Sequence, residues 1–203
     1  MLLDITGKTP QKKVTHIKRK SDIKTKTEKF KLKHQKIIKN IGEIFDIPKK
    51  DEVINILTNN QFNAYSFIPY ILSKQKIKKL YVITYFITPT VIENLSNYAI
   101  SGEVEELYLY VSDHILRRRE RTAKMLIELF DKYDNIKIGF AFSHAKITIM
   151  DNFVITGSGN MNKNSRIEQY MFFNNQDIAD FFKSAFFQEF KITEKTRKDL
   201  YEV

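Results

Sequence analysis

The chain contains no cysteine in its 203 residues, which excludes disulfides, thiolate zinc sites and cysteine nucleophiles. It has no tryptophan either, although it carries 16 phenylalanines and 10 tyrosines. No apolar run is long enough for a signal peptide or a membrane span. With 42% hydrophobic residues, the chain can bury the core of one ordinary domain. We therefore expect a soluble, cytoplasmic protein that has no membrane partner.

The positive charge is concentrated at the amino-terminal end. Residues 1 to 40 contain 13 Lys and Arg against 3 Asp and Glu, whereas the remainder contains 21 of each sign. The first fifth of the chain therefore carries the whole formal charge of +10. Such a segment favours a polyanionic partner, and nucleic acid, either DNA or RNA, fits best. The alternative is a solvated, lysine-rich tail that has no partner.

The apolar pattern divides the chain at residue 48. Residues 1 to 30 show no sustained period and predict a flexible basic arm. From Phe30 to Ile47 apolar residues recur at helical spacing, which predicts that this arm (residues 1–48) ends in a helix close to Pro48. We expect residues 49–203 to form the folded domain.

Strands and helices are expected to alternate in the folded domain. Runs rich in Val, Ile, Tyr and Phe predict strands at residues 53–57, 80–87, 107–111, 136–142, 146–150, 154–156 and 167–173. Periodic apolar residues predict helices at residues 63–73, 89–99, 116–133 and 177–190. This alternation indicates an α/β domain with a central, largely buried sheet, and the chain shows no internal repeat.

One short stretch near the carboxyl-terminal end gathers the chemistry. It begins with His144-Ala145-Lys146, continues to Asp151 and ends in Gly157-Ser158-Gly159-Asn160. Side chains two apart on a strand point to the same face, so we expect His144 and Lys146 to point together. Asp151 is expected to point to the other face and to be structural. Gly157 belongs to the same structural frame, since glycine lets the backbone approach a ligand closely.

These residue types suit the cleavage of a phosphodiester, whose anionic oxygens repel nucleophiles. Lys146 would neutralise that charge, and Ser158 and Asn160 would donate hydrogen bonds to phosphate oxygens. The neutral imidazole of His144 would attack and form a covalent phosphohistidine that water then hydrolyses. The leaving alkoxide needs a proton, and one histidine cannot be nucleophile and acid at once.

The spacing resembles the HKD signature of the phospholipase D superfamily, H-x-K-x4-D followed by G-S-x-N. The resemblance implies a phospholipase D-like domain, in which helices flank both faces of a mixed central sheet. It implies a homodimer as well, because small nucleases of this superfamily carry one motif per chain and share a site across a two-fold axis. It implies no metal and no cofactor. It also implies that Glu168, after G-S-x-N, bonds the catalytic His144 and sets its tautomer.

Each of these residues also has a plainer interpretation. His16-Ile17-Lys18 and His34-Gln35-Lys36 repeat the H-x-K pattern without the rest of the signature, so H-x-K by itself indicates nothing. The stretch from Gly157 to Asn160 is also compatible with a simple turn, and Glu168 with an ordinary edge-strand carboxylate. We expect Arg117-Arg118-Arg119 to be a solvated helix face. A further stripe is more typical of core or dimer contact than of a ligand site; its members are Phe181, Phe182 and Phe186.

Three functions fit the sequence. A small chain with one motif and a basic arm favours a nuclease that hydrolyses DNA or RNA without a metal. The alternative is a protein that binds nucleic acid without cutting it and uses the groove as a phosphate clamp. Lipid phosphodiester chemistry is the third, and no amphipathic anchor accompanies the arm to support it.

Overall fold

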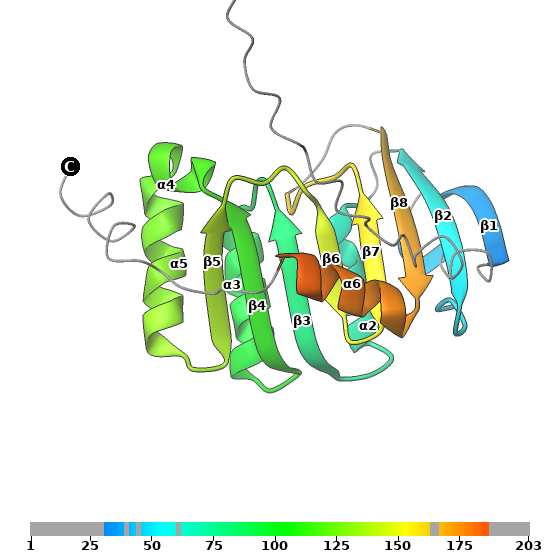
Figure 1. Cartoon of the computed structure of the whole chain (residues 1–203), viewed down its shortest axis with the longest axis horizontal. Helices are drawn as coiled ribbons and strands as arrows, with labels where there is room; N and C mark the ends of the chain where they lie inside the picture. The colour runs from blue at the N-terminus through cyan, green and yellow to red at the C-terminus, as the bar shows by residue number, and fades with distance from the viewer. Residues whose placement is uncertain (1–30, 39–40, 44–45, 60–61, 163–166, 187–203) are drawn as a thin grey trace, which may run out of the picture.

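The computed structural model describes residues 31–38, 41–43, 46–59, 62–162 and 167–186, drawn in colour in Figure 1. Within these residues eight strands form one sheet in the order β1-β2-β8-β7-β6-β3-β4-β5. The strands are β1 (Lys31–Ile38), β2 (Glu52–Asn59), β3 (Ile77–Thr84), β4 (Val104–Ser112), β5 (Ile136–Ala141), β6 (Ile147–Met150), β7 (Phe153–Gly157) and β8 (Ile167–Asn174). The basic arm expected over residues 1 to 30 lies outside the described residues.

The sheet is mixed because its two parts are connected differently. Strands β3, β4 and β5 run parallel, and each pair needs a helical crossover. The crossovers contain α3 (Pro89–Ile100), α4 (His114–Arg118) and α5 (Glu120–Lys132). Strands β6, β7 and β8 run antiparallel through short connections, and β6 joins them to β3 while β8 joins them to β2. The expected mixed α/β sheet is confirmed.

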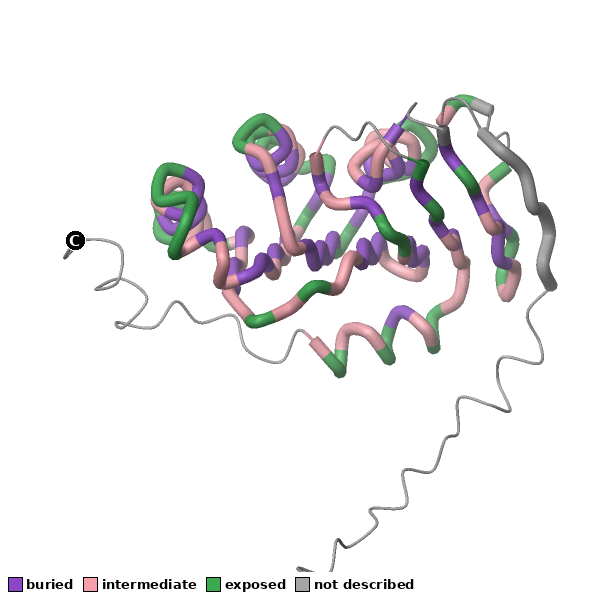
Figure 2. Tube along the Cα trace, turned by 90° about the horizontal axis from the view of Figure 1, so that it is seen from above, coloured by how far each residue is buried: buried purple, intermediate pink, exposed green. Residues whose placement is uncertain are grey.

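Helices cover both faces of the sheet, as Figure 2 shows from above. On one face lie α2 (Phe67–Leu72), α3 and α5, and their apolar sides form the larger core cluster with the strands. On the other face α6 (Gln176–Phe186) packs against a smaller cluster. Two short 3-10 helices, η1 (Ile41–Glu43) and η2 (Ala64–Ser66), lie before and after β2. The expectation of helices on both faces is therefore confirmed.

Strand β3 shows why the central strands read as nearly continuous apolar runs. Its side chains alternate between the two faces, because successive residues of a strand point to opposite sides. Leu80 and Val82 enter the larger cluster, whereas Tyr81 and Ile83 enter the smaller one beside Ala179 of α6. Since both faces are covered, both sets are buried.

The helix expected between Phe30 and Ile47 is wrong over Lys31–Ile38, whereas Ile41–Glu43 forms the short η1. Residues Lys31–Ile38 form β1, which pairs in parallel with β2 from Lys31↔Glu52 to Ile38↔Thr58. The apolar spacing suited a helix, but backbone pairing with a neighbouring strand outweighs such a weak local preference. β1 also covers what would otherwise be an open sheet edge. Phe30 and residues 44 and 45 lie outside the described residues, and the division at residue 48 stays a prediction.

The remaining helices begin and end close to the expected positions. α3 begins at Pro89, whose fixed φ suits the first helical position. The single helix expected over residues 116–133 is two helices, since Arg119 has φ −141° and ψ 52° and separates α4 from α5. The expected end of the last helix, residues 187–190, lies outside the described residues. None of the described helices combines the length and the apolar character needed to cross a membrane.

Candidate active site

His144 and Lys146 lie in the connection between β5 and β6, just before β6 begins at Ile147. The Nζ atom of Lys146 lies 3.1 Å from Nδ1 of His144 and 2.8 Å from its carbonyl oxygen. His144 is exposed, whereas Lys146 is half-buried. The two side chains therefore meet as their spacing predicts, although they precede the strand instead of lying within it.

Two aromatic residues that sequence reasoning missed stand beside this pair. Tyr85 directly follows β3, and its ring centroid lies 4.4 Å from that of His144 and 5.5 Å from that of His114. The Lys146 ammonium lies 5.9 Å from the Tyr85 centroid, within reach of a cation–π contact. Tyr85 and His114 both follow parallel strands at their carboxyl ends, where α/β sheets place their ligands. Their position after two strands was the signal by which the sequence could have revealed these two residues.

Ser158 is held where β7 meets β8. Its backbone N–H donates to the carbonyl of Gln169 at 3.0 Å, and the Gln169 N–H donates to Ser158 Oγ at 3.1 Å. The Ser158 hydroxyl in turn donates to Oε2 of Glu168. Glu168 is 9% exposed, so this carboxylate is nearly enclosed.

Glu168 therefore does not bond His144 as the resemblance implied. In the described part of the chain its side chain bonds Ser158, and the His144 ring bonds Lys146. The physical reason is the β7–β8 pairing: Gly157 lies opposite Tyr170, which brings the next residue, Ser158, against Glu168 and Gln169. The Glu168 carboxylate therefore accepts a hydrogen bond from the Ser158 hydroxyl, which strand pairing holds beside it.

Burial and charge act in opposite directions on Lys146. Desolvation lowers the pKa of its ammonium group below the ordinary lysine value, because burial disfavours the charged form. The charge of Glu168 raises the same pKa and offsets part of that effect. The buried carboxylate thus helps to keep Lys146 protonated, which is the form that binds an anion.

The buried oxygens that have no hydrogen-bond partner among the described residues include two near this site. One is Oδ1 of Asn160, and the other is Oγ1 of Thr58. Thr58 lies directly opposite Glu168 in the β2–β8 ladder, so both side chains lie on the same face. Buried polar atoms are nearly always bonded, so such exceptions are typical of sites that receive a ligand or water. Sequence reasoning named Asn160 but missed Thr58, which carries no local signal.

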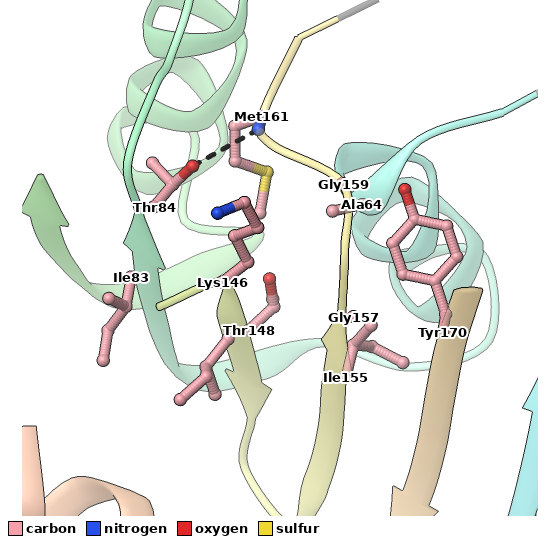
Figure 3. Close-up of a pocket in the computed structure, with 11 residues that line it drawn as sticks. Ala64, Ile83, Thr84, Lys146, Thr148, Ile155, Gly157, Gly159, Met161 and Tyr170 are labelled. Carbon is pink, nitrogen blue, oxygen red and sulfur yellow. Dashed lines mark hydrogen bonds between the residues drawn. The ribbon is translucent and has the colours of Figure 1, made fainter. Parts of the chain in front are cut away.

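A small cavity of ≈ 10 Å³ lies beneath the loop that contains Gly159. Figure 3 shows the Lys146 side chain extending between Thr84 and Met161 at its wall. The Met161 N–H donates to Thr84 Oγ1 at 3.4 Å and to the Phe86 carbonyl at 3.2 Å, which anchors the loop to the end of β3. The space suffices for about one water molecule. A ligand larger than a water molecule therefore does not fit inside it.

Gly157 ends β7 at a point where no side chain fits. A Cβ atom there would lie 2.4 Å from the Gln169 carbonyl oxygen and 2.4 Å from Cδ1 of Tyr170. These separations are far below van der Waals contact, so glycine allows the close approach of β7 and β8. The loop from Gly157 to Asn160 then leaves the sheet as an irregular connection instead of a tight hairpin.

Asp151 lies at the opposite end of β6 from Lys146, in the tight turn to β7. Its φ is +57°, a left-handed conformation that aspartate tolerates better than most residues. Its carboxylate accepts hydrogen bonds from the backbone N–H groups of Lys78 and Lys79 at 3.2 and 3.0 Å. These contacts tie the turn to the start of β3 and involve no reacting group. Among the described residues, no group of three or more His, Asp or Glu side chains could hold a metal ion.

No protein-family model matches the chain. No curated protein matches it either.

Solved structures do resemble it. Nuc, a phospholipase D family member from Salmonella typhimurium, is 19% identical, with 66% of this chain and 90% of that chain covered and a TM-score of 0.48. NucT from Helicobacter pylori is 18% identical, with 66% and 93% covered and a TM-score of 0.48. Polyphosphate kinase from Porphyromonas gingivalis is 13% identical, with 76% and 29% covered and a TM-score of 0.53. At these identities the likeness is one of fold, and the fold is that of an α/β protein.

Proposed function

We propose that the chain is a metal-independent nuclease that hydrolyses DNA or RNA through a covalent phosphohistidine in a homodimeric site. One observation carries the proposal: the exposed His144 ring is paired at 3.1 Å with the ammonium of Lys146. This places a nucleophile and a cation side by side on an open surface. A phosphodiester needs both, because its negative charge must be neutralised before attack.

The hydrogen bond between the two residues defines the resting state. An ammonium group only donates, so Nδ1 of a neutral His144 ring accepts and Nε2 carries the proton. The anionic oxygens of a phosphodiester are stronger acceptors than imidazole. Substrate binding therefore draws the Lys146 ammonium toward the phosphate and releases the lone pair of Nδ1 for attack.

The reaction then proceeds in two balanced steps. In the first, the freed nitrogen of the neutral His144 forms a bond to phosphorus while a phosphorus–oxygen bond breaks. The leaving oxygen takes a proton from His144 of the partner subunit, which enters this step as an imidazolium, without the hydrogen bond from Lys146, and becomes neutral. In the second, water attacks phosphorus and the phosphorus–nitrogen bond breaks. The attacking water gives its proton to His144 of the partner subunit, which restores it. Two imidazoles are needed because acid and nucleophile act together, and a two-fold dimer supplies both.

The surrounding polar residues divide the remaining roles. The single hydroxyl proton of Ser158 is directed to Glu168, so Ser158 fixes that carboxylate in the resting site. Contacts to the phosphate oxygens then fall to Lys146 and to the Nδ2 amide of Asn160. Glu168 acts through Lys146, whose protonated form its charge favours.

The decisive experiment incubates the full chain with single- and double-stranded DNA and RNA in excess EDTA. We expect hydrolysis by the wild type, none by His144→Ala, and a nucleotide adduct on His144 detectable by mass spectrometry. His34→Ala is the matched control, because it removes an imidazole from another H-x-K sequence at the far edge of the sheet. Complete loss of activity in EDTA would contradict the metal-independent mechanism. Binding without cleavage by the wild type would establish the non-catalytic alternative.

A further inference from the structure

His144 lies at the end of the sheet where the parallel strands finish. The same end carries a group of residues with no part in the proposed chemistry. Strands β3, β4 and β5 are parallel neighbours, so their carboxyl ends meet there. Tyr85 follows β3, α4 follows β4, and Phe142 follows β5. The chain then passes from Phe142 to His144 in two residues. Whatever binds along this end of the sheet also reaches the candidate active site.

Phe142 is 97% exposed, the most exposed of the large apolar side chains in the described residues. One exposed phenylalanine is ordinary on a protein surface, and by itself it indicates nothing. Its surroundings distinguish it, because the adjoining segment of α4 is strongly basic.

The basic segment comprises Arg117, Arg118 and Arg119, all exposed. It is tied to the end of β5, since the Asp113 N–H donates to the Ala141 carbonyl at 3.0 Å and Arg117 pairs with Asp113 at 2.9 Å. Ala141 directly precedes Phe142. Arg117 therefore lies close to the residue that precedes the exposed ring, and all three arginines are exposed, as expected for a solvated helix face.

Each arginine has capacity left for a ligand. Arg118 has no ion pair within the described residues. The Arg119 guanidinium lies 5.2 Å from the Phe86 ring centroid, and a contact with the face of a ring uses none of the five N–H donors of a guanidinium. A guanidinium binds phosphate through two parallel hydrogen bonds, which makes arginine the preferred phosphate ligand.

We propose that this end of the sheet binds single-stranded nucleic acid, with a base stacked on Phe142 and the backbone on Arg117, Arg118 and Arg119. The proposal rests on the nuclease function above and names its substrate class. Bases inside a duplex are stacked on their neighbours, so their faces are closed to a protein side chain, whereas an unpaired base offers its face. Aromatic rings combined with a basic track are the usual means of binding single strands.

The proposed dimer brings the two copies of His144 together, but a second copy of this chain is a poor partner for the arginines themselves. In a two-fold interface a patch meets its own copy, so the three arginines would approach three identical charges. Such like-charge contacts oppose association, whereas a phosphate backbone supplies the opposite charge. Charge complementarity therefore favours nucleic acid as the occupant.

The test measures binding separately from cleavage. The full chain, made inactive by His144→Ala, is titrated by fluorescence anisotropy with a thymidine oligonucleotide, an abasic strand of equal length and a duplex of equal length. The abasic strand keeps every phosphate but offers no base. Phe142→Ala should weaken thymidine-strand binding by about 5- to 150-fold, the cost of one stacked base, and leave the abasic strand and the duplex nearly unchanged. Phe142→Tyr should restore the affinity.

Two further variants test whether the effect is specific to Phe142 and how much the arginine charge contributes to binding. Phe181→Ala removes another exposed phenylalanine, which belongs to α6 and not to the strand ends that carry Phe142. It should leave the affinities for all three ligands unchanged. Arg118→Gln should weaken binding to all three ligands and reduce the slope of log Kd against log salt by about one.

Several results would overturn the proposal. These are equal effects of Phe142→Ala on the thymidine and abasic strands, no effect on either, or dissociation of a dimer by Phe142→Ala in sedimentation. The wild-type cleavage assay remains a separate measurement. Base-dependent binding without hydrolysis would leave this inference standing and remove the proposed catalysis. Hydrolysis without base-dependent binding would refute this inference and leave the proposed catalysis standing.

Discussion

The Lys146 ammonium bonds both Nδ1 and the carbonyl oxygen of His144, at 3.1 and 2.8 Å. An ammonium group has three N–H donors, so in the resting site two hold the side chain in place and the third is left to meet a ligand, before the bond to Nδ1 is released. The cation is therefore positioned before substrate arrives. The nearby charge of Glu168 favours its protonated state against the effect of burial.

The first prediction concerns the alkaline side of the pH–rate profile. Activity needs protonated Lys146, so the rate falls as pH rises through the pKa of this group, which burial has lowered. Glu168→Gln keeps an acceptor for Ser158 but removes the negative charge that raises this pKa. We expect the alkaline limb of kcat/KM to move to lower pH in this variant, in parallel with NMR titration of Lys146.

Asp180→Asn serves as the control, because Asp180 pairs with Lys183 on α6 and is not among the groups that shift the pKa of Lys146. Its profile should match the wild type. A limb that stays in place in Glu168→Gln, or moves to higher pH, would show that Glu168 does not act on Lys146 through its charge.

The second prediction concerns the shared site. If each reaction uses His144 from both subunits, a dimer with one His144→Ala subunit is inactive at its single composite site. Random pairing of equal amounts of wild-type and variant subunits should then leave about one quarter of the activity, against about one half for independent sites. The measurement needs differently tagged subunits, dissociated and reassembled, with tagged wild type alone as control. An activity of one half would refute sharing.

The third prediction concerns Gly157. Adding a Cβ atom forces it against the Gln169 carbonyl and the Tyr170 ring, each 2.4 Å away. Gly157→Ala should lower the free energy of unfolding by about 1–3 kcal/mol or more, as overpacking does, and should displace Ser158. Gly102→Ala is the control: its Cβ meets nothing within 4 Å, and its φ of +78° costs only about 1 kcal/mol. Equal losses in urea unfolding would disprove the steric explanation.

The fourth prediction concerns Asp151, which accepts two backbone hydrogen bonds from the start of β3. Asp151→Ala should lower the free energy of unfolding by about 1–3 kcal/mol, because two N–H groups lose their partner. Asp151→Asn keeps one acceptor oxygen and tolerates the left-handed backbone, so it should lose less. In both variants kcat of the folded protein should match the wild type. A large fall in kcat without unfolding would place Asp151 in the chemistry.

The fifth prediction concerns residues 1 to 30, which contain nine Lys and Arg against three Asp and Glu. Deleting them should weaken nucleic acid binding and flatten the dependence of log Kd on log salt, because fewer counterions are released. The deletion ends before β1, so the sheet stays complete. An arm of the same composition in scrambled order should bind like the wild type. An unchanged salt slope after deletion would mean that the arm does not contact the nucleic acid.

Local patterns predicted the elements that local chemistry governs. The apolar runs of β2, β4, β5 and β8 and the amphipathic face of α5 were recognised because alternation and helical periodicity depend on near neighbours. Pro89 marked the first residue of α3 for the same reason. The β1 segment was misread, because its strand forms through pairing with β2, some twenty residues further along the chain.

The candidate site divides in the same way. The meeting of His144 with Lys146 follows from a spacing of two residues, so composition and order were enough to predict it. The Ser158–Glu168 bond, the contact of the Tyr85 ring with His144 and the bond of Asp113 to Ala141 form only in the folded sheet. Strand order and register bring distant residues together, and these depend on packing both faces at once, which no local pattern encodes.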